Sequence, residues 1–147
     1  MDIQQVDVAD LESVKLLIGQ VSAVDVLPHF NVQGKAEYQT CVLSDIITTF
    51  DVERFQTLKV VDSGEIVGFA ALRDGNYLTH LFVSKSLQGQ GIGRRLLRAL
   101  LNTTDAKEIS LRSSVNAIGF YESYGFETIG SEADFNGIRF VPMRLVR

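Results

Sequence analysis

The sequence has few of the features that mark secreted or membrane proteins. It contains one cysteine, which cannot form an internal disulfide and therefore favours a reducing compartment. No apolar run approaches the ~18 residues that a membrane span requires. Residues 1–5 include neither a basic region nor an apolar stretch, so no secretory signal is expected. We therefore expect a cytoplasmic protein that makes no contact with membranes.

Charge and histidine content argue against two further classes of ligand. The chain has 14 Lys and Arg against 18 Asp and Glu, a net charge of -4, whereas proteins that bind nucleic acid rely on basic surfaces. The acidic balance is compatible with a cationic amine as substrate. The two histidines, His29 and His80, lack the spacing of metal ligands, so we expect no metal.

Length and residue spacing predict one domain that spans residues 1–147, since this length suffices for a full core. Helical spacing of apolar residues is found over residues 7–20, 35–50, 91–102 and 115–124. Strand patterns bounded by turns are found over residues 54–61, 65–72, 77–83, 108–112, 126–130 and 138–145. Residues 21–34 are less regular and are expected to form a loop. This order predicts an α/β fold, with a mixed, mostly antiparallel sheet and helices on both faces.

A glycine-rich turn follows the predicted strand 77–83. It runs Gln-Gly-Gln-Gly-Ile-Gly from Gln88 to Gly93 and precedes the predicted helix 91–102. Such a turn leaves backbone N–H groups unpaired at the positive end of a helix dipole, and its small residues let an anion approach the backbone. The dinucleotide pattern G-x-G-x-x-G fails at Arg94, and no stretch fits a P-loop. The turn therefore predicts binding of a phosphorylated small molecule.

The pattern that remains is Q-x-x-G-x-G, formed by Gln88, Gly91 and Gly93. It resembles the acyl-CoA-binding motif of the GNAT superfamily, the acetyl-CoA-dependent N-acetyltransferases. Residues 117–126 are similar to a second signature of this family, A-x-x-F-Y-x-x-x-G-F. The resemblance covers about residues 54–145 and implies a single GNAT domain that uses acetyl-CoA.

The cofactor contacts follow from the turn and from this resemblance. The backbone N–H groups of residues 89–94 are expected to hold the pyrophosphate, and the resemblance places pantetheine along the strand that contains Leu81 and Val83. Lys85, Arg94 or Arg95 is a candidate for the 3′-phosphate. Asn116, or the nearby Ser114, contacts the cofactor or caps a helix. The predicted cofactor-binding residues are Leu81, Val83, Gln88, Gly89, Gln90, Gly91, Ile92, Gly93, Arg94 and Asn116.

Tyr121 is the predicted catalytic residue. In the family the tyrosine of F-Y-x-x-x-G-F lies near the cofactor sulfur, where it protonates the leaving thiolate. An unperturbed phenol has a pKa of about 10, close to that of an alkyl thiol, so proton transfer is near balance. The alternative is a tyrosine that is only packed in the core.

The general base is not evident from the sequence. The positions where family members often place a base hold Tyr77 and Thr79. His80 titrates near neutrality if it is unperturbed, but strand alternation places it on the face opposite Leu81. A water chain that ends at Asp25, Glu37 or Asp45 is a further alternative. Cys41 lies on the apolar face of the helix predicted over residues 35–50 and is expected to be a buried small residue, not a nucleophile.

These features predict an N-acetyltransferase that transfers the acetyl group of acetyl-CoA to a primary amine by direct attack in a ternary complex. The acceptor is a small molecule or a peptide. Residues 21–38 are expected to bind it, with Asp25 and Glu37 attracting an ammonium group and Phe30 and Tyr38 forming a wall. Residues 131–137 are the alternative acceptor site. A different acyl group, a non-catalytic acyl-CoA sensor on the same fold and a homodimer are left open.

Overall fold

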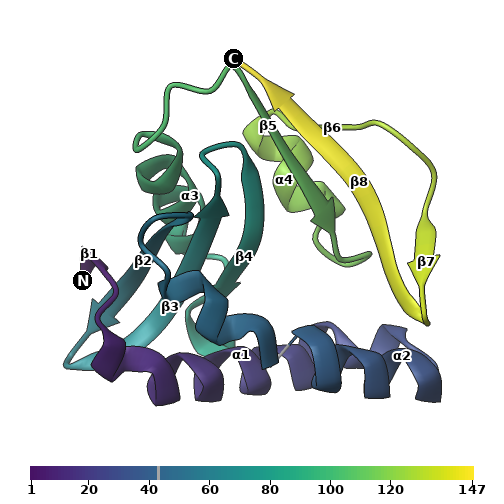
Figure 1. The fold of residues 1–147 in the computed structure, drawn as a ribbon, viewed down its shortest axis with the longest axis horizontal. Helices are drawn as coiled ribbons and strands as arrows, with labels where there is room; N and C mark the ends of the chain where they lie inside the picture. The colour runs from purple at the N-terminus through teal and green to yellow at the C-terminus, as the bar shows by residue number, and fades with distance from the viewer. Residues whose placement is uncertain (43) are drawn as a thin grey trace.

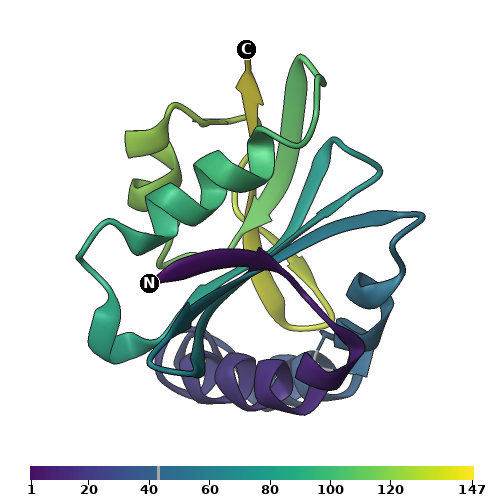
Figure 2. The ribbon, with the colours of Figure 1, turned by 90° about the vertical axis from the view of Figure 1, so that its left-hand side faces the viewer.

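A twisted sheet forms the middle layer of the protein, and helices cover both of its faces (Figures 1 and 2). The computed structural model describes residues 1–42 and 44–147. The strands are β1 (Asp2–Gln5), β2 (Phe55–Asp62), β3 (Glu65–Arg73), β4 (Tyr77–Val83), β5 (Glu108–Ser113), β6 (Glu127–Thr128), β7 (Ala133–Phe135) and β8 (Ile138–Val146). The α-helices are α1 (Leu11–Asp25), α2 (Val32–Glu37), α3 (Ile92–Leu101) and α4 (Ile118–Tyr124). Short helical segments are η1 (Val8–Asp10), η2 (Leu27–His29), η3 (Tyr38–Val42), η4 (Ser44–Phe50) and η5 (Lys85–Leu87).

The strands are ordered β1-β2-β3-β4-β5-β8-β6 across the sheet, and β7 pairs with β8 beside this path. Neighbouring strands are antiparallel with one exception, the parallel pair β4 and β5. The predicted mixed, mostly antiparallel sheet with helices on both faces is therefore confirmed. The short strands β1 and β7 were not predicted, because strands of four and three residues show little periodicity. No helix within residues 1–42 and 44–147 is long and apolar enough to span a bilayer.

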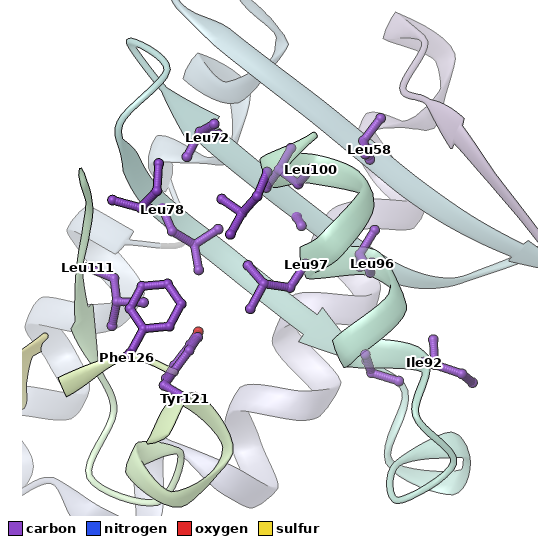
Figure 3. Close-up of a cluster of buried hydrophobic side chains, with 14 of the residues drawn as sticks. Leu58, Leu72, Leu78, Ile92, Leu96, Leu97, Leu100, Leu111, Tyr121 and Phe126 are labelled. Atoms are coloured by element: carbon purple, nitrogen blue, oxygen red, sulfur yellow. The ribbon is translucent and has the colours of Figure 1, made fainter. Parts of the chain in front are cut away.

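Two hydrophobic clusters hold the helices on the sheet. On one face, α3 buries Leu96, Leu97, Leu100 and Leu101 against β2, β3 and β4, because this spacing places all four side chains on one side of the helix (Figure 3). On the other face, α1 packs against Phe69 of β3. The sheet is thus buried on both faces, and the functional residues must lie where strands separate or end.

The N-terminal helix is longer than the sequence analysis predicted. Helix α1 continues through Asp25, so the expected loop over residues 21–34 is wrong in its first part. Val21 and Ser22 are buried and extend the apolar stripe of Val14 and Ile18 by another turn. The loop is also shorter at its other end, because the Asn31 side chain accepts a hydrogen bond from the Gly34 N–H and starts α2.

The single helix predicted over residues 35–50 is also wrong. The chain passes from α2 into a π-helical turn, η3, and then into the 3-10 segment η4, with residue 43 outside the described part. Because the winding changes, the side chains do not keep one face, and Cys41 is exposed instead of buried. Its Sγ donates to Oε1 of Glu37, and this hydrogen bond together with the Glu37 charge raises the pKa of the Cys41 thiol. The thiolate is disfavoured, which agrees with the expectation that Cys41 is no nucleophile.

Truncation of the α3 stripe should reveal how much the fold depends on this helix. Leu100 is fully buried, so Leu100→Ala should lower the free energy of unfolding by about 2 to 5 kcal/mol. Leu16→Ala is the matched control, because Leu16 is 62% exposed on α1 and its loss should change stability by no more than about 0.5 kcal/mol. Urea unfolding of both variants measures the difference. Equal losses in the two variants would contradict this description of the core.

Candidate active site

The parallel strands β4 and β5 separate along their length (Figure 1). They pair at Tyr77 with Ser110 and at Leu78 with Leu111, and the pairing ends there. At the same point the register between β3 and β4 shifts, because Ala71 pairs with His80 whereas Leu72 pairs with Leu78. Thr79 is therefore an extra residue in β4. Such a bulge bends its strand, so the second half of β4 turns away from β5.

The separation leaves one edge of β4 open. The Ser84 N–H donates to the Val67 carbonyl, so the backbone groups of Leu81 and Val83 point the other way by alternation, toward β5. The Val83 carbonyl accepts a hydrogen bond from Nε2 of Gln88 at 3.0 Å. Because β5 has diverged here, this edge is available to an extended ligand.

A cleft of about 740 Å³ lies at the separation, within the usual range for small-molecule sites. Predicted residues that line it are Leu81, Val83, Gln88, Gly89, Gly91, Gly93, Arg94, Asn116 and Tyr121. Two of the predicted cofactor-binding residues do not line the cleft. Gln90 is exposed outside the cleft, and the Ile92 side chain is buried under α3, so both offer only their backbone N–H groups to a ligand.

The glycine-rich turn has the geometry of an anion site. Gly89 and Gly91 adopt φ values of 82° and 81°, which a residue with a Cβ rarely takes. The first helical hydrogen bond of α3 runs from the Arg95 N–H to the Gly91 carbonyl. Among the described residues, none accepts a hydrogen bond from the N–H groups of residues 89–94. A row of free donors at the N-terminus of a ten-residue helix favours a bound anion.

Gln88 and Lys85 connect this turn to the end of α1. Both donate to Asp25, with Lys85 Nζ 2.8 Å from Oδ1 and Gln88 Nε2 3.1 Å from Oδ2. Burial alone would raise the pKa of Asp25, but the hydrogen bonds from Lys85 and Gln88 and the charges of Lys85 and His29 outweigh it and lower the pKa. Asp25 is therefore a partner of the turn and not the free carboxylate expected to attract an ammonium group.

The structure brings Tyr121 to the same cleft. Its ring packs between Phe120 and Phe126, and its hydroxyl is directed away from α4 toward the layer of Leu97 and Leu111 (Figure 3). Burial raises the pKa of Tyr121 well above its usual range. The phenol stays protonated. Because its pKa is raised above that of an alkyl thiol, proton transfer from this phenol to a thiolate is less favourable than transfer from an unperturbed phenol.

Asn116 does not cap α4. The N-cap of this helix is Ala117, no side chain makes the cap hydrogen bond, and the Ser114 carbonyl accepts from the Ala117 N–H. The capping role weighed for Asn116 or Ser114 is therefore wrong. Both residues line the cleft instead.

Of the basic residues that are candidates for the 3′-phosphate, Arg94 lines the cleft, with its guanidinium over the Tyr124 ring.

His80 lies in the cleft wall on the opposite face of β4 from Leu81, as alternation predicts. Its ring packs against Phe69 and Phe82, and its Nδ1 is 2.8 Å from the Thr79 hydroxyl. Burial lowers the pKa of His80 to about 4, so it does not titrate near neutrality as an unperturbed histidine would. A base this weak removes a proton from an ammonium group poorly. Within the described chain, no three His, Cys, Asp or Glu side chains gather to form a metal site.

Both segments that were predicted as acceptor sites, residues 21–38 and residues 131–137, contribute to the lining of the cleft. Phe30 and Tyr38 line it from the α2 side, and Phe135 lines it from the β7–β8 hairpin. The two segments meet at Gly34 and Gly137, where a Cβ on either residue would overlap the backbone of the other. Glu37 lies outside the lining.

The side chains of β5 and β8 that line the cleft were not predicted from the sequence. Arg112, Arg139 and Phe140 line the cleft. No motif marks these residues, and their position depends on the pairing of β5 with β8, which the sequence pattern does not fix.

The model of the acetyltransferase (GNAT) domain family matches residues 26–147. The chain belongs to the GNAT acetyltransferase family. Among its GNAT relatives, a peptidyl-lysine N-acetyltransferase, YjaB of Salmonella typhimurium, is 32% identical over 110 residues, 71% of this chain and 72% of the relative. A probable spermine N(1)-acetyltransferase of Bacillus subtilis subsp. natto is 33% identical over 92 residues, 50% of this chain and 60% of the relative.

A solved GNAT structure has the same fold. The PaiA N-acetyltransferase of Thermoplasma acidophilum, in complex with coenzyme A, superposes with a TM-score of 0.74 over 99% of this chain and 98% of that protein. The two sequences are 17% identical. The fold and the family together make this GNAT chain an acyltransferase.

The buried state of His80 predicts a pH-dependent stability. Below its ordinary pKa of about 6.5 the unfolded histidine takes up a proton, whereas the folded one stays neutral down to about pH 4. The unfolded state then binds more protons, so the free energy of unfolding should fall by about 2 kcal/mol between pH 7 and pH 5. His80→Asn should lose this component. Urea unfolding of both proteins at the two pH values measures it, and an identical pH dependence would show that His80 is not buried as described.

Proposed function

We propose that this GNAT chain binds acetyl-CoA in the cleft between β4 and β5 and transfers the acetyl group to a primary amine by direct attack in a ternary complex. One observation carries the proposal, namely that three groups of different kinds face the same cleft. They are the free N–H groups of residues 89–94, the open edge at Leu81 and Val83, and the side chain of Tyr121. Acetyl-CoA has matching parts, a pyrophosphate, an extended pantetheine with amide groups, and a thioester.

The residues of the turn fit the pyrophosphate. Gly89 and Gly91 have open space where a Cβ would lie, so phosphate oxygens can reach the backbone donors. Gln88 fixes the turn against the Val83 carbonyl and Asp25, so little order has to be gained on binding. The coenzyme A in the Thermoplasma GNAT structure supports the same cofactor for this chain.

Tyr121 is the proposed proton donor. Acetyl-CoA supplies the acetyl group on a thioester, and a proton has to reach the departing sulfur. The Tyr121 hydroxyl is protonated over the whole physiological range because burial raises its pKa. We propose that the ammonium group loses one proton to water at the cleft mouth, because His80 is too weak a base and Asp25 is paired. The second proton, which the nitrogen releases as the amide forms, replaces through water the proton that Tyr121 gives to sulfur.

A primary amine is the proposed acceptor class. The Salmonella relative is a peptidyl-lysine N-acetyltransferase and the Bacillus relative a probable spermine N(1)-acetyltransferase. Both names describe transfer to an amine nitrogen. The cleft wall of Phe30, Tyr38 and Phe135 provides room for the acceptor on the side away from α4.

The turn can be tested with a charge placed in it. Gly91→Asp should abolish detectable binding of acetyl-CoA in calorimetry, because the carboxylate would face the pyrophosphate. Gly64→Asp is the matched control. Gly64 has a φ of 79° and open space around a built Cβ, so it incurs similar backbone strain in the β2–β3 turn without a charge in the cleft. Gly91→Asp with the affinity of the control would refute the phosphate assignment.

Removal of one oxygen tests the proton donor. Tyr121→Phe should reduce kcat by roughly 100-fold or more with little change in acetyl-CoA affinity, because the ring and its packing remain. Tyr124→Phe on the same helix is the control and should keep full activity. Turnover is followed by release of coenzyme A with an established acceptor. Wild-type kcat in Tyr121→Phe would leave Tyr121 a packing residue, and cofactor binding without turnover in the parent protein would favour the non-catalytic sensor.

A further inference from the structure

The acceptor side of the cleft has arginines where a site for polyamines would need carboxylates. Among the described residues of the lining, Asp25 is the one carboxylate, and it is held by Lys85 and Gln88. Arg112 and Arg139 line the cleft on the β5 and β8 side. The local charge is thus opposite to the net charge of the chain.

The guanidinium of Arg139 is hydrogen-bonded to other groups of the protein. Its guanidinium binds both carboxylate oxygens of Glu132 at 3.0 and 2.9 Å and donates to the His29 carbonyl at 3.1 Å. These contacts use three of its five N–H donors and compensate its charge. Arg139 therefore builds the wall and is not the group that attracts a ligand.

Arg112 is different. Its guanidinium carbon lies 4.6 Å from the centre of the Phe140 ring, and among the described residues no carboxylate is within 4.0 Å of it. Leu111 is buried in the cluster under α3, so alternation turns Arg112 to the opposite face, the side of α1 and α2, where its side chain is exposed. Its charge is close enough to Tyr77 to oppose the rise in pKa that burial causes there.

One aromatic ring packs on this cation, and two others line the same cleft. Phe140 lies beneath it, Tyr77 is on the adjacent strand, and Phe135 is on the hairpin. A guanidinium on an aromatic ring keeps its plane and its donors in a fixed orientation, which suits two parallel hydrogen bonds to a carboxylate.

We propose that the acceptor is an amine that also bears a carboxylate, an amino acid or acidic peptide, whose carboxylate pairs with Arg112 and whose apolar part packs on Phe140 and Tyr77. This inference rests on the proposed acetyl transfer and adds the acceptor class. A polyamine would meet Arg112 as a like charge and would find no free carboxylate among the described lining residues. This chain is thus expected to differ from its spermine-acetylating relative in acceptor.

Matched acceptor pairs test the proposal. L-phenylalanine and L-lysine should be acetylated with kcat/KM about tenfold or more above L-phenylalaninamide and L-lysinamide, and above spermine. Arg112→Gln should abolish this preference by lowering kcat/KM for the acids, and Arg112→Lys should restore part of it. Arg98→Gln is the control, because it removes the same charge from the exposed face of α3 and should leave the preference unchanged.

Binding separates failure of this inference from failure of the proposed function. Calorimetry with acetyl-CoA alone reports on the function, and Arg112→Gln should bind acetyl-CoA like the wild type. N-acetyl-L-phenylalanine should bind the coenzyme A complex more tightly than N-acetyl-L-phenylalaninamide. If acetyl-CoA binds but the acids are no better than the amides, in turnover or in product binding, the acceptor class is wrong while the function stands. If acetyl-CoA does not bind, both are wrong.

Discussion

Strands β4 and β5 pair over two residue pairs and then diverge, and the position of each functional group follows from that divergence. The bulge at Thr79 bends β4, which frees the edge at Leu81 and Val83 and opens the cleft between the two strands. The sheet can tolerate this gap because α3 and α1 cover its faces and bury the strands on both sides. Were β4 and β5 paired to their ends, the open edge would be used within the sheet and Tyr121 would lie under a closed surface.

The glycine-rich turn of residues 88–93 and the cleft wall at Tyr38 are joined through helix α1. Asp25 accepts hydrogen bonds from Gln88 and Lys85, so the turn before α3 is held from the opposite face of the sheet. The wall has its own support, since Ser22 of α1 and Tyr38 share a buried hydrogen bond of 2.8 Å. Helix α1 therefore contacts both the proposed cofactor side and the proposed acceptor side, and a change in either is expected to affect the other through this one helix.

Sequence patterns predicted the sheet and the glycine-rich turn before α3, because both depend on local features. The alternation of residues 77–83 and the glycines of the turn specify β4 and the start of α3 in place. Sequence patterns gave wrong predictions where tertiary packing determines the environment of a side chain. Burial of His80 between aromatic rings, not its residue type, sets its pKa, and the π-helical turn that exposes Cys41 has no periodic signature. Arg112 was missed because only the pairing of β5 and β8 brings it over Phe140.

Amide chemical shifts give the most direct test that the cofactor lies at the divergence of β4 and β5. The labelled protein would be titrated with coenzyme A and, separately, with pantetheine, which lacks the pyrophosphate. The amides of residues 89–94 should shift with coenzyme A and not with pantetheine, because only the former brings an anion to the free donors. The amides of Leu81 and Val83 should shift with both. Saturating coenzyme A that left the amides of residues 89–94 unchanged would contradict the proposed site.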